Sequence, residues 1–149
     1  MDDSPRVSRP LLIGWKERLD FPDWGIRRVK VKADTGARTS ALGAVSYDLY
    51  HADAVGLCIR LRLALNRKHV GEVHMVEAPV LQMVVVRNSG GMPEQRPLIE
   101  TDIVLGPVRK RIRLTVTNRS GMLFRVILGR KALANDFLVD VSKKYLLRP

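Results

Sequence analysis

The sequence predicts an all-β fold, because apolar residues mostly alternate with polar ones and turn signals recur at short intervals. Between Val55 and Leu63, apolar side chains alternate with glycine, cysteine and arginine, as in a strand with one buried face. Between Val108 and Val116, most apolar residues share one face and three arginines share the other. We expect seven or eight short strands of this kind, arranged as a barrel or a sandwich.

In the first two thirds of the chain, extended segments alternate with short connections. The first clear strand is the run Ile26–Ala33. The apolar runs Val80–Val86 and Leu98–Leu105 flank the loop Arg87–Arg96, whose turn-forming residues would let it act as a flap over a substrate. An ordinary solvated hairpin loop explains this segment equally well, and the shorter hairpin Leu65–Gly71 is a second flap candidate.

The C-terminal part combines a strand, a glycine and a helix. An apolar strand, Met122–Leu128, leads to Gly129, and a short helical pattern follows from about Arg130 to Asn135. The last predicted strand lies near Phe137–Val139. One short helix close to the C-terminus is therefore expected in an otherwise all-β chain.

Length and composition indicate one globular domain. Its bounds are residues 11–149, after a polar, proline-containing leader, residues 1–10, that we expect to be disordered. Hydrophobic residues make up 46% of the 149 residues, which is enough for a core. The sequence has no apolar run of membrane-spanning length and no signal peptide, and the single Cys58 suits a reducing compartment. We therefore expect a cytoplasmic protein with no membrane partner.

The net charge of +11 favours an acidic partner. Charge alone does not distinguish an acidic polypeptide from nucleic acid or an anionic membrane. Aromatic residues make up only 5% of the chain, and no basic run is interleaved with them, which argues against a nucleic-acid partner. Composition therefore leaves open which acidic partner, such as an acidic polypeptide substrate, the charge attracts.

The triplet Asp34-Thr35-Gly36 is the main candidate for chemistry. It follows a predicted strand directly, and such triplets commonly form turns, because Asp caps backbone N–H groups and Gly accepts positive φ. A carboxylate on such a turn is also the core of an aspartic-peptidase site, in which two carboxyl groups share one proton. The hydrophobic segment that ends at Gly129 favours the catalytic interpretation, since in these enzymes a glycine there passes close behind the Asp loop.

One such triplet supplies half of a catalytic pair. The second carboxylate is expected from another copy of the chain, so we predict a homodimer. Asp102, which follows an apolar-rich strand, is the alternative partner within the same chain.

No cofactor or metal is predicted. The three histidines, His51, His69 and His74, form no zinc-binding motif, and no glycine-rich phosphate loop is present. Cys58 has no motif of a thiol protease, and we interpret it as an inert strand residue.

Several segments together resemble a bacterial family known as "ATP-dependent zinc proteases". The resemblance covers nearly the whole chain and includes LIGWKE, KADTGARTSALGA, SGGMPEQRPLIET, LTVTNRSGMLFRVILGRKAL and FLVD. Members are often encoded beside the glutamate ligase RimK and look like retropepsins, the small dimeric aspartic peptidases of viruses. The resemblance implies a retropepsin-like closed β-barrel, with a functional link to a glutamate ligase.

The resemblance also assigns roles to individual residues. Asp34 matches the catalytic aspartate, Thr35 and Gly36 complete its triplet, and Gly129 matches the glycine of the supporting segment. The basic residues Lys32 and Arg38 depart from the retropepsin pattern and suggest an anionic substrate. The expected substrate-binding residues are Arg38, Ser40, Arg87 and Arg96.

The sequence thus predicts a retropepsin-type aspartic endopeptidase that acts on glutamate-tailed proteins or polyglutamate. The alternative is a non-catalytic basic module that binds ribosomal protein or RNA through Arg109, Arg111 and Arg113.

Overall fold

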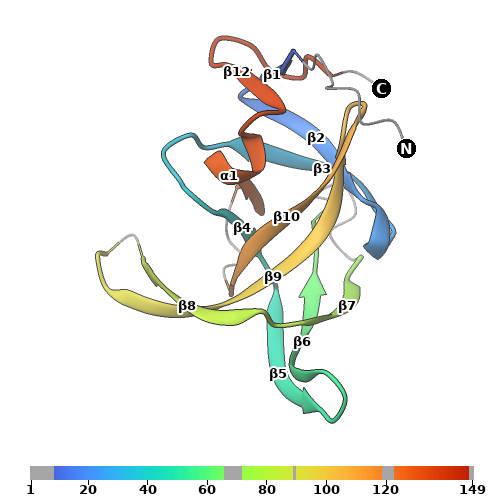
Figure 1. Cartoon of the computed structure of the whole chain (residues 1–149), viewed down its shortest axis with the longest axis vertical. Coiled ribbons are helices and arrows are strands. Elements are labelled where there is room, and N and C mark those ends of the chain that lie inside the picture. Colours follow the sequence, from blue (N-terminus) through green and yellow to red (C-terminus); the bar gives the residue numbers. More distant parts are fainter. Residues whose placement is uncertain (1–8, 66–71, 89, 119–122, 148–149) are drawn as a thin grey trace.

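The computed structural model describes residues 9–65, 72–88, 90–118 and 123–147. Most of the chain is extended (Figure 1). The strands are β1 (Leu11–Gly14), β2 (Lys16–Phe21), β3 (Ile26–Ala33), β4 (Ser40–Gly43), β5 (Ser46–Ala52), β6 (Gly56–Leu63), β7 (His74–Pro79), β8 (Gln82–Arg87), β9 (Pro93–Leu105), β10 (Val108–Thr117), β11 (Val126–Leu128) and β12 (Phe137–Asp140). The helices are the 3-10 turn η1 (Pro22–Trp24) and α1 (Arg130–Leu133).

A closed β-barrel forms the body of the molecule. Its sheet has the strand order β10-β4-β11-β3-β2-β9-β8, and pairing of β9 with β10 joins the first six strands into a ring. β8 extends this sheet beyond the ring as the partner of β9. The all-β prediction is confirmed, with a barrel in place of a sandwich and one short α-helix near the C-terminus.

The barrel core follows the period-two pattern of the strands. In β2, Glu17, Leu19 and Phe21 are buried while the residues between them are partly exposed. Val29 and Val31 of β3 pack into the same interior. Complete burial of an aliphatic or aromatic side chain contributes about 1.5–3 kcal/mol, so these strands are held mainly by their inward-facing residues.

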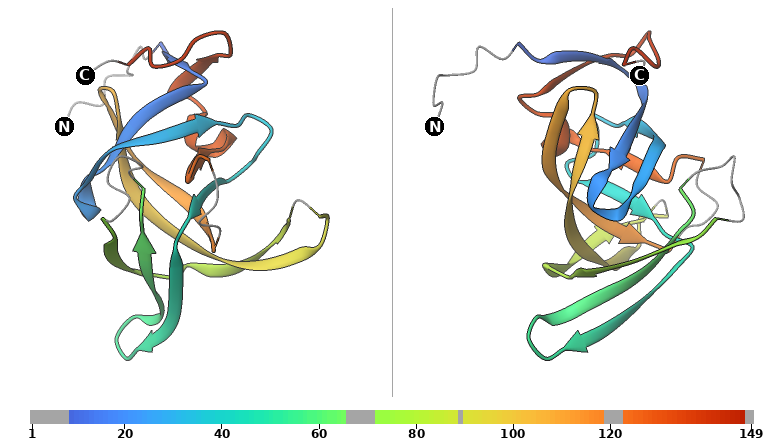
Figure 2. Two further views of the ribbon diagram at one scale, coloured as in Figure 1. Left: turned by 180° about the vertical axis from the view of Figure 1, so that it is seen from behind. Right: turned by 90° about the vertical axis from the view of Figure 1, so that its right-hand side faces the viewer.

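A second sheet, β5-β6-β7, projects from the barrel as an arm (Figure 2). Its β6 strand buries Ile59, Leu61 and Leu63 and exposes Arg60 and Arg62, as the alternation predicts. Cys58 is buried in the same strand, as expected of a strand residue.

Two details differ from the sequence prediction. The described residues contain more strands than the seven or eight expected, because short strands such as β4 (Ser40–Gly43) form through pairing with distant strands and carry no local alternation. The loop predicted at Arg87–Arg96 is shorter, since β9 begins at Pro93 and pairs with β8 up to Arg87.

Some predictions fall on residues that the structure does not describe. These are residues 1–8 of the expected leader, residues 66–71 of the second flap candidate, and Met122 at the start of the predicted C-terminal strand. Among the described helices, none is long and apolar enough to cross a membrane.

A buried carboxylate fastens the C-terminal segment to the barrel. Glu17 is 1% exposed, and its carboxylate accepts hydrogen bonds from the backbone N–H groups of Gly14 (2.7 Å), Leu146 (2.8 Å) and Leu147 (3.2 Å). At Gly14 the segment passes so close that an added Cβ would lie 2.6 Å from the carbonyl oxygen of Lys143. The C-terminal segment is therefore part of the folded domain.

We predict that Glu17→Gln destabilises the protein by about 1–3 kcal/mol, because a side-chain amide cannot accept all three hydrogen bonds and turns a donor toward N–H groups. Urea unfolding followed by circular dichroism measures this change. Glu72→Gln is the matched control, since Glu72 is exposed. Equal stability of Glu17→Gln and Glu72→Gln would show that Glu17 does not fasten the segment.

Candidate active site

Asp34 lies in a tight turn directly after β3 (Ile26–Ala33). Its backbone N–H donates to the carbonyl oxygen of Leu128 at 2.8 Å, which ties the turn to β11. The N–H of Gly36 donates to Asp34 Oδ1 at 3.0 Å, and the N–H of Ala37 donates to the Asp34 carbonyl oxygen at 3.1 Å. The Asp34 side chain is therefore fixed from its own loop and remains partly exposed.

Gly129 passes directly behind this loop. A Cβ at this position would lie 2.7 Å from the carbonyl carbon of Thr39 and 2.9 Å from the carbonyl oxygen of Ala37. The N–H of Gly129 donates to Ser40 Oγ at 3.0 Å, and the N–H of Arg130 donates to the Ala37 carbonyl at 2.7 Å. The prediction that two backbones meet here without room for a side chain is confirmed.

The Arg130 side chain holds the triplet from the outside. Its Nη1 donates to the carbonyl oxygens of Thr35 (3.0 Å) and Gly36 (3.1 Å). These contacts fix the backbone of the Thr35–Gly36 segment. The exposed Thr35 side chain is left accessible.

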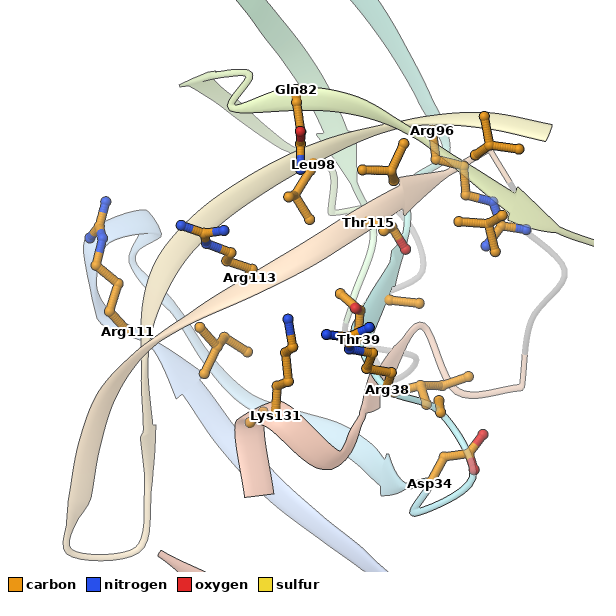
Figure 3. Close-up of a pocket in the computed structure, with 18 residues that line it drawn as sticks. Asp34, Arg38, Thr39, Gln82, Arg96, Leu98, Arg111, Arg113, Thr115 and Lys131 are labelled. Carbon is orange, nitrogen blue, oxygen red and sulfur yellow. The ribbon is translucent and has the colours of Figure 1, made fainter. Parts of the chain in front are cut away.

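A cavity of about 770 Å³ opens beside the Asp34 loop (Figure 3). Its walls come from this loop, from β10, from α1 and from the β8–β9 hairpin. The lining residues are Asp34, Ala37, Arg38, Thr39, Ala41, Gln82, Val84, Val85, Val86, Arg96, Leu98, Arg111, Ile112, Arg113, Thr115, Ile127, Lys131 and Ala132. The β8–β9 hairpin thus forms one wall of the cavity.

Among the described residues that line this cavity, Asp34 is the single acidic one and five are basic. Three of these cations are paired. Arg111 and Arg113 contact Glu100 at 3.2 and 3.7 Å, and Arg96 contacts Glu94 at 2.7 Å. Hydrogen bonding to Glu100 raises the pKa of Arg111 further.

Arg38 and Lys131 supply the uncompensated charge. In the described part of the chain neither side chain has a carboxylate partner, and both are exposed. Lys131 extends from α1 toward β10 (Figure 3). Their backbones are joined, because the Lys131 N–H donates to the Arg38 carbonyl at 3.1 Å. The cavity therefore presents two free cations on the segments that hold the Asp34 loop.

The structure separates the predicted substrate-binding residues into two groups. Arg38 and Arg96 line the cavity together with Asp34. Ser40 is corrected: it is 1% exposed, and its hydroxyl accepts the Gly129 N–H, so it supports the loop from inside. Arg87 is exposed and is not among the lining residues; its Nη1 donates to the Gly91 carbonyl at 2.8 Å in the hairpin turn, and its contact with a substrate stays a prediction.

Sequence reasoning missed three basic residues of the cavity. Lys131 is adjacent to Gly129-Arg130, so its nearness to the Asp34 loop followed from the position assigned to Gly129. Arg111 and Arg113 were expected on the outer face of a strand, where they do lie, but the cavity is formed against that face.

Asp102, the alternative catalytic partner, does not line the cavity. Its carboxylate contacts Arg109 at 3.1 Å and Arg111 at 3.4 Å. Because the arginines of β10 are paired with carboxylates in this way, the basic stripe on which the alternative binding function depends is largely neutralised. Among the described residues, no group of three or more His, Cys, Asp or Glu side chains could hold a metal ion.

A closed β-barrel with an Asp-Thr-Gly turn supported by a glycine-containing strand defines the class of retropepsin-like proteins. Residues 12–149 match the model of a family described as "Retropepsin-like aspartic endopeptidase RimB". The chain belongs to this RimB-like family. The match confirms the retropepsin-like part of the resemblance, while the zinc-protease name stays a resemblance only.

Similar curated proteins carry a different name. A "probable alpha-L-glutamate ligase" of Parasynechococcus marenigrum is 35% identical over 95% of this chain, and one of Shewanella pealeana is 32% identical over 91%. The chain spans only 30% of the length of each of these proteins. A region similar to the whole barrel is therefore part of longer proteins that carry a ligase name.

The fold has also been observed in a crystal structure. Lpg0085 of Legionella pneumophila, a protein of unknown function, superposes with a TM-score of 0.77. It is 21% identical, and the similarity covers 94% of this chain and all of that one. This likeness supports the fold.

We predict that Gly129→Ala displaces the Asp34 loop and destabilises the protein by about 2 kcal/mol or more, because the new Cβ meets backbone atoms that no rotamer change can move. Thermal unfolding measures the effect. Gly90→Ala is the control, since a Cβ there lies 3.4 Å from a side-chain oxygen of Asn88. Equal melting of the two variants would contradict the close approach at Gly129.

Proposed function

We propose that the protein is an aspartic endopeptidase whose active unit is a homodimer, with Asp34 from each chain forming the catalytic pair. The observation that carries this proposal is the Asp34 loop, fixed by Leu128, Gly129 and Arg130 beside a cavity whose described lining holds no second carboxylate. Membership of the RimB-like family supports the same chemistry.

In the proposed reaction, the ionised carboxylate of the pair removes a proton from a water molecule, whose oxygen attacks the carbonyl carbon of the peptide bond. The protonated carboxyl donates a hydrogen bond to the carbonyl oxygen, and a tetrahedral intermediate forms. A proton is then transferred to the amide nitrogen, the C–N bond breaks, and an acid and an amine leave. Two carboxyl groups within hydrogen-bonding distance of each other share one proton, so the pair titrates as one coupled unit.

The charge of the cavity supports an acidic substrate. Arg38 and Lys131 are free cations on the two segments that hold the catalytic loop, and Arg96 adds a paired cation from the hairpin. Glutamate side chains flanking the scissile bond would pair with Arg38 and Lys131. Similarity to proteins named as glutamate ligases agrees with a substrate whose glutamate tail a ligase has added.

We further propose that the β8–β9 hairpin is the flap. Val84, Val85 and Val86 of β8 line the cavity, and Val85 is 66% exposed, so apolar surface is available to cover a bound peptide. Closure would exclude water from the peptide bond and strengthen the ionic contacts to its acidic side chains.

Asp34→Asn should abolish cleavage of glutamate-tailed peptides while melting stays as in the wild type, because the amide cannot act as a base. Mass spectrometry of the products across pH, with a chelator and without nucleotide, is the measurement. Asp53→Asn, an exposed control, should keep full activity. Turnover by Asp34→Asn at the wild-type rate would rule out the mechanism, and activity that requires zinc would show a different one.

Arg38→Ala and Lys131→Ala should each raise KM for a glutamate-rich peptide by roughly tenfold, with a much smaller change for a neutral peptide. Added salt should imitate both variants, since it screens the same contacts. Arg62→Ala, which removes a cation outside the cavity, is the control. Equal losses on the acidic and the neutral peptide would mean that these residues hold the loop and do not recognise the substrate.

A further inference from the structure

The outer face of the β2–β3 hairpin places cations directly opposite one another. In the antiparallel register Lys16 faces Lys32, and Arg18 faces Lys30. Like charges in directly opposed cross-strand positions destabilise a sheet, and a fold with no use for them would replace one of each pair. These pairs are therefore a feature that folding alone does not explain.

This face contains almost no compensating negative charge. In the described residues, none of these four cations forms an ion pair with a carboxylate. Asp20 is the carboxylate at the end of the face, and it is occupied: it accepts the Arg28 backbone N–H at 2.8 Å and lies 4.0 Å from Arg27. The remaining positive charge is open to solvent or to a partner.

Nearby aromatic rings hold the cations without neutralising them. Lys16 Nζ lies 5.6 Å from the ring centroid of Trp15, 5.3 Å from that of Phe124 and 5.5 Å from that of Tyr145. Arg18 stacks over Tyr145 at 4.2 Å. Such contacts fix the position of a cation and leave its charge available.

A second cavity, of about 540 Å³, lies at the end of this face and shares no lining residue with the first. Arg18, Arg27, Arg28 and Tyr145 contribute to its wall, together with apolar residues such as Leu147. Arg28 (φ 59°) and Tyr145 (φ 54°) are two of the three non-glycine residues with positive φ in the described part of the chain. Backbone conformations of this kind cost energy and concentrate at functional sites.

We propose that this basic track, defined as Lys16, Arg18, Arg27, Arg28, Lys30 and Lys32, binds an extended acidic polypeptide outside the catalytic cavity. Lys32 and Lys30 lie two positions apart on β3, about 6.6 Å along the strand, and Arg28 follows at the irregularity where the register with β2 shifts. Alternate side chains of an extended peptide have the same spacing, so carboxylates on every second residue meet successive cations. The identification of this peptide as a substrate rests on the proposed peptidase function.

The same observations disfavour other partners. One face of each neighbouring ring is already covered by Lys16 or Arg18, which leaves less ring surface for the base stacking that single-stranded RNA uses. A second copy that met this face with its own β2–β3 face would bring the same positive charges against it and be repelled.

The test measures binding of fluorescent oligoglutamate to the uncleaving Asp34→Asn protein by anisotropy. A peptide of about twelve glutamates, which extends over roughly 40 Å, can reach the track, whereas one of about four fills only the cavity. Adding Arg18→Glu and Lys30→Glu should raise Kd for the long peptide at least tenfold and leave Kd for the short peptide within about twofold. With Asp34 restored, turnover of the short peptide should be unchanged.

Arg60→Glu with Arg62→Glu, on the exposed face of the arm, changes the net charge equally and is the matched control. If both double variants raise Kd for the long peptide equally, overall charge alone attracts the peptide. This result would overturn the proposal. If the Asp34→Asn protein binds oligouridylate more tightly than oligoglutamate, the partner is not an acidic polypeptide, and the proposal is overturned. Length-dependent peptide binding without any cleavage by the wild type would refute the peptidase function and leave the track in place.

Discussion

The backbone of Gly129 crosses the backbone of residues 37–39 at a distance that leaves no space for a side chain, and the geometry of the whole site depends on this crossing. The crossing brings β11 beside β3, so that the Leu128 carbonyl accepts the Asp34 N–H. It also buries the Ser40 hydroxyl against the Gly129 N–H and places α1 against the cavity. These contacts hold the Asp34 carboxylate in one orientation. A shared catalytic pair requires such a fixed orientation.

Charge is distributed with a clear division between paired and unpaired cations. The arginines of β10 are compensated by Glu100 and Asp102, so they stabilise the β9–β10 ribbon and add little net field. In the described residues, Arg38, Lys131 and the cations of the basic track other than Arg27 form no ion pair with a carboxylate. Within the described residues, unpaired cations thus occur both around the Asp34 loop and along β2–β3. A long acidic chain would be attracted to both surfaces at once, which favours long tails over short ones.

The sequence was most informative where one local motif requires one geometry. Asp34 and Gly129 were predicted because an Asp-Gly turn after a strand, and a glycine where backbones meet, leave few other interpretations. Ser40 was assigned to the substrate because sequence position cannot show whether a hydroxyl turns inward. The nearness of Lys131 to the loop followed from Gly129, but sequence position cannot show that its side chain lines the cavity, because this depends on how α1 packs.

The shared catalytic pair is the central claim, and subunit mixing tests it most directly. A trace of wild-type protein is equilibrated with increasing excess of Asp34→Asn, and peptidase activity per wild-type chain is measured. If two chains contribute one carboxylate each, activity should fall toward zero as wild-type chains are captured in mixed dimers. Activity that stays constant at every excess of the variant would show that a single chain holds the complete site, and would contradict the account.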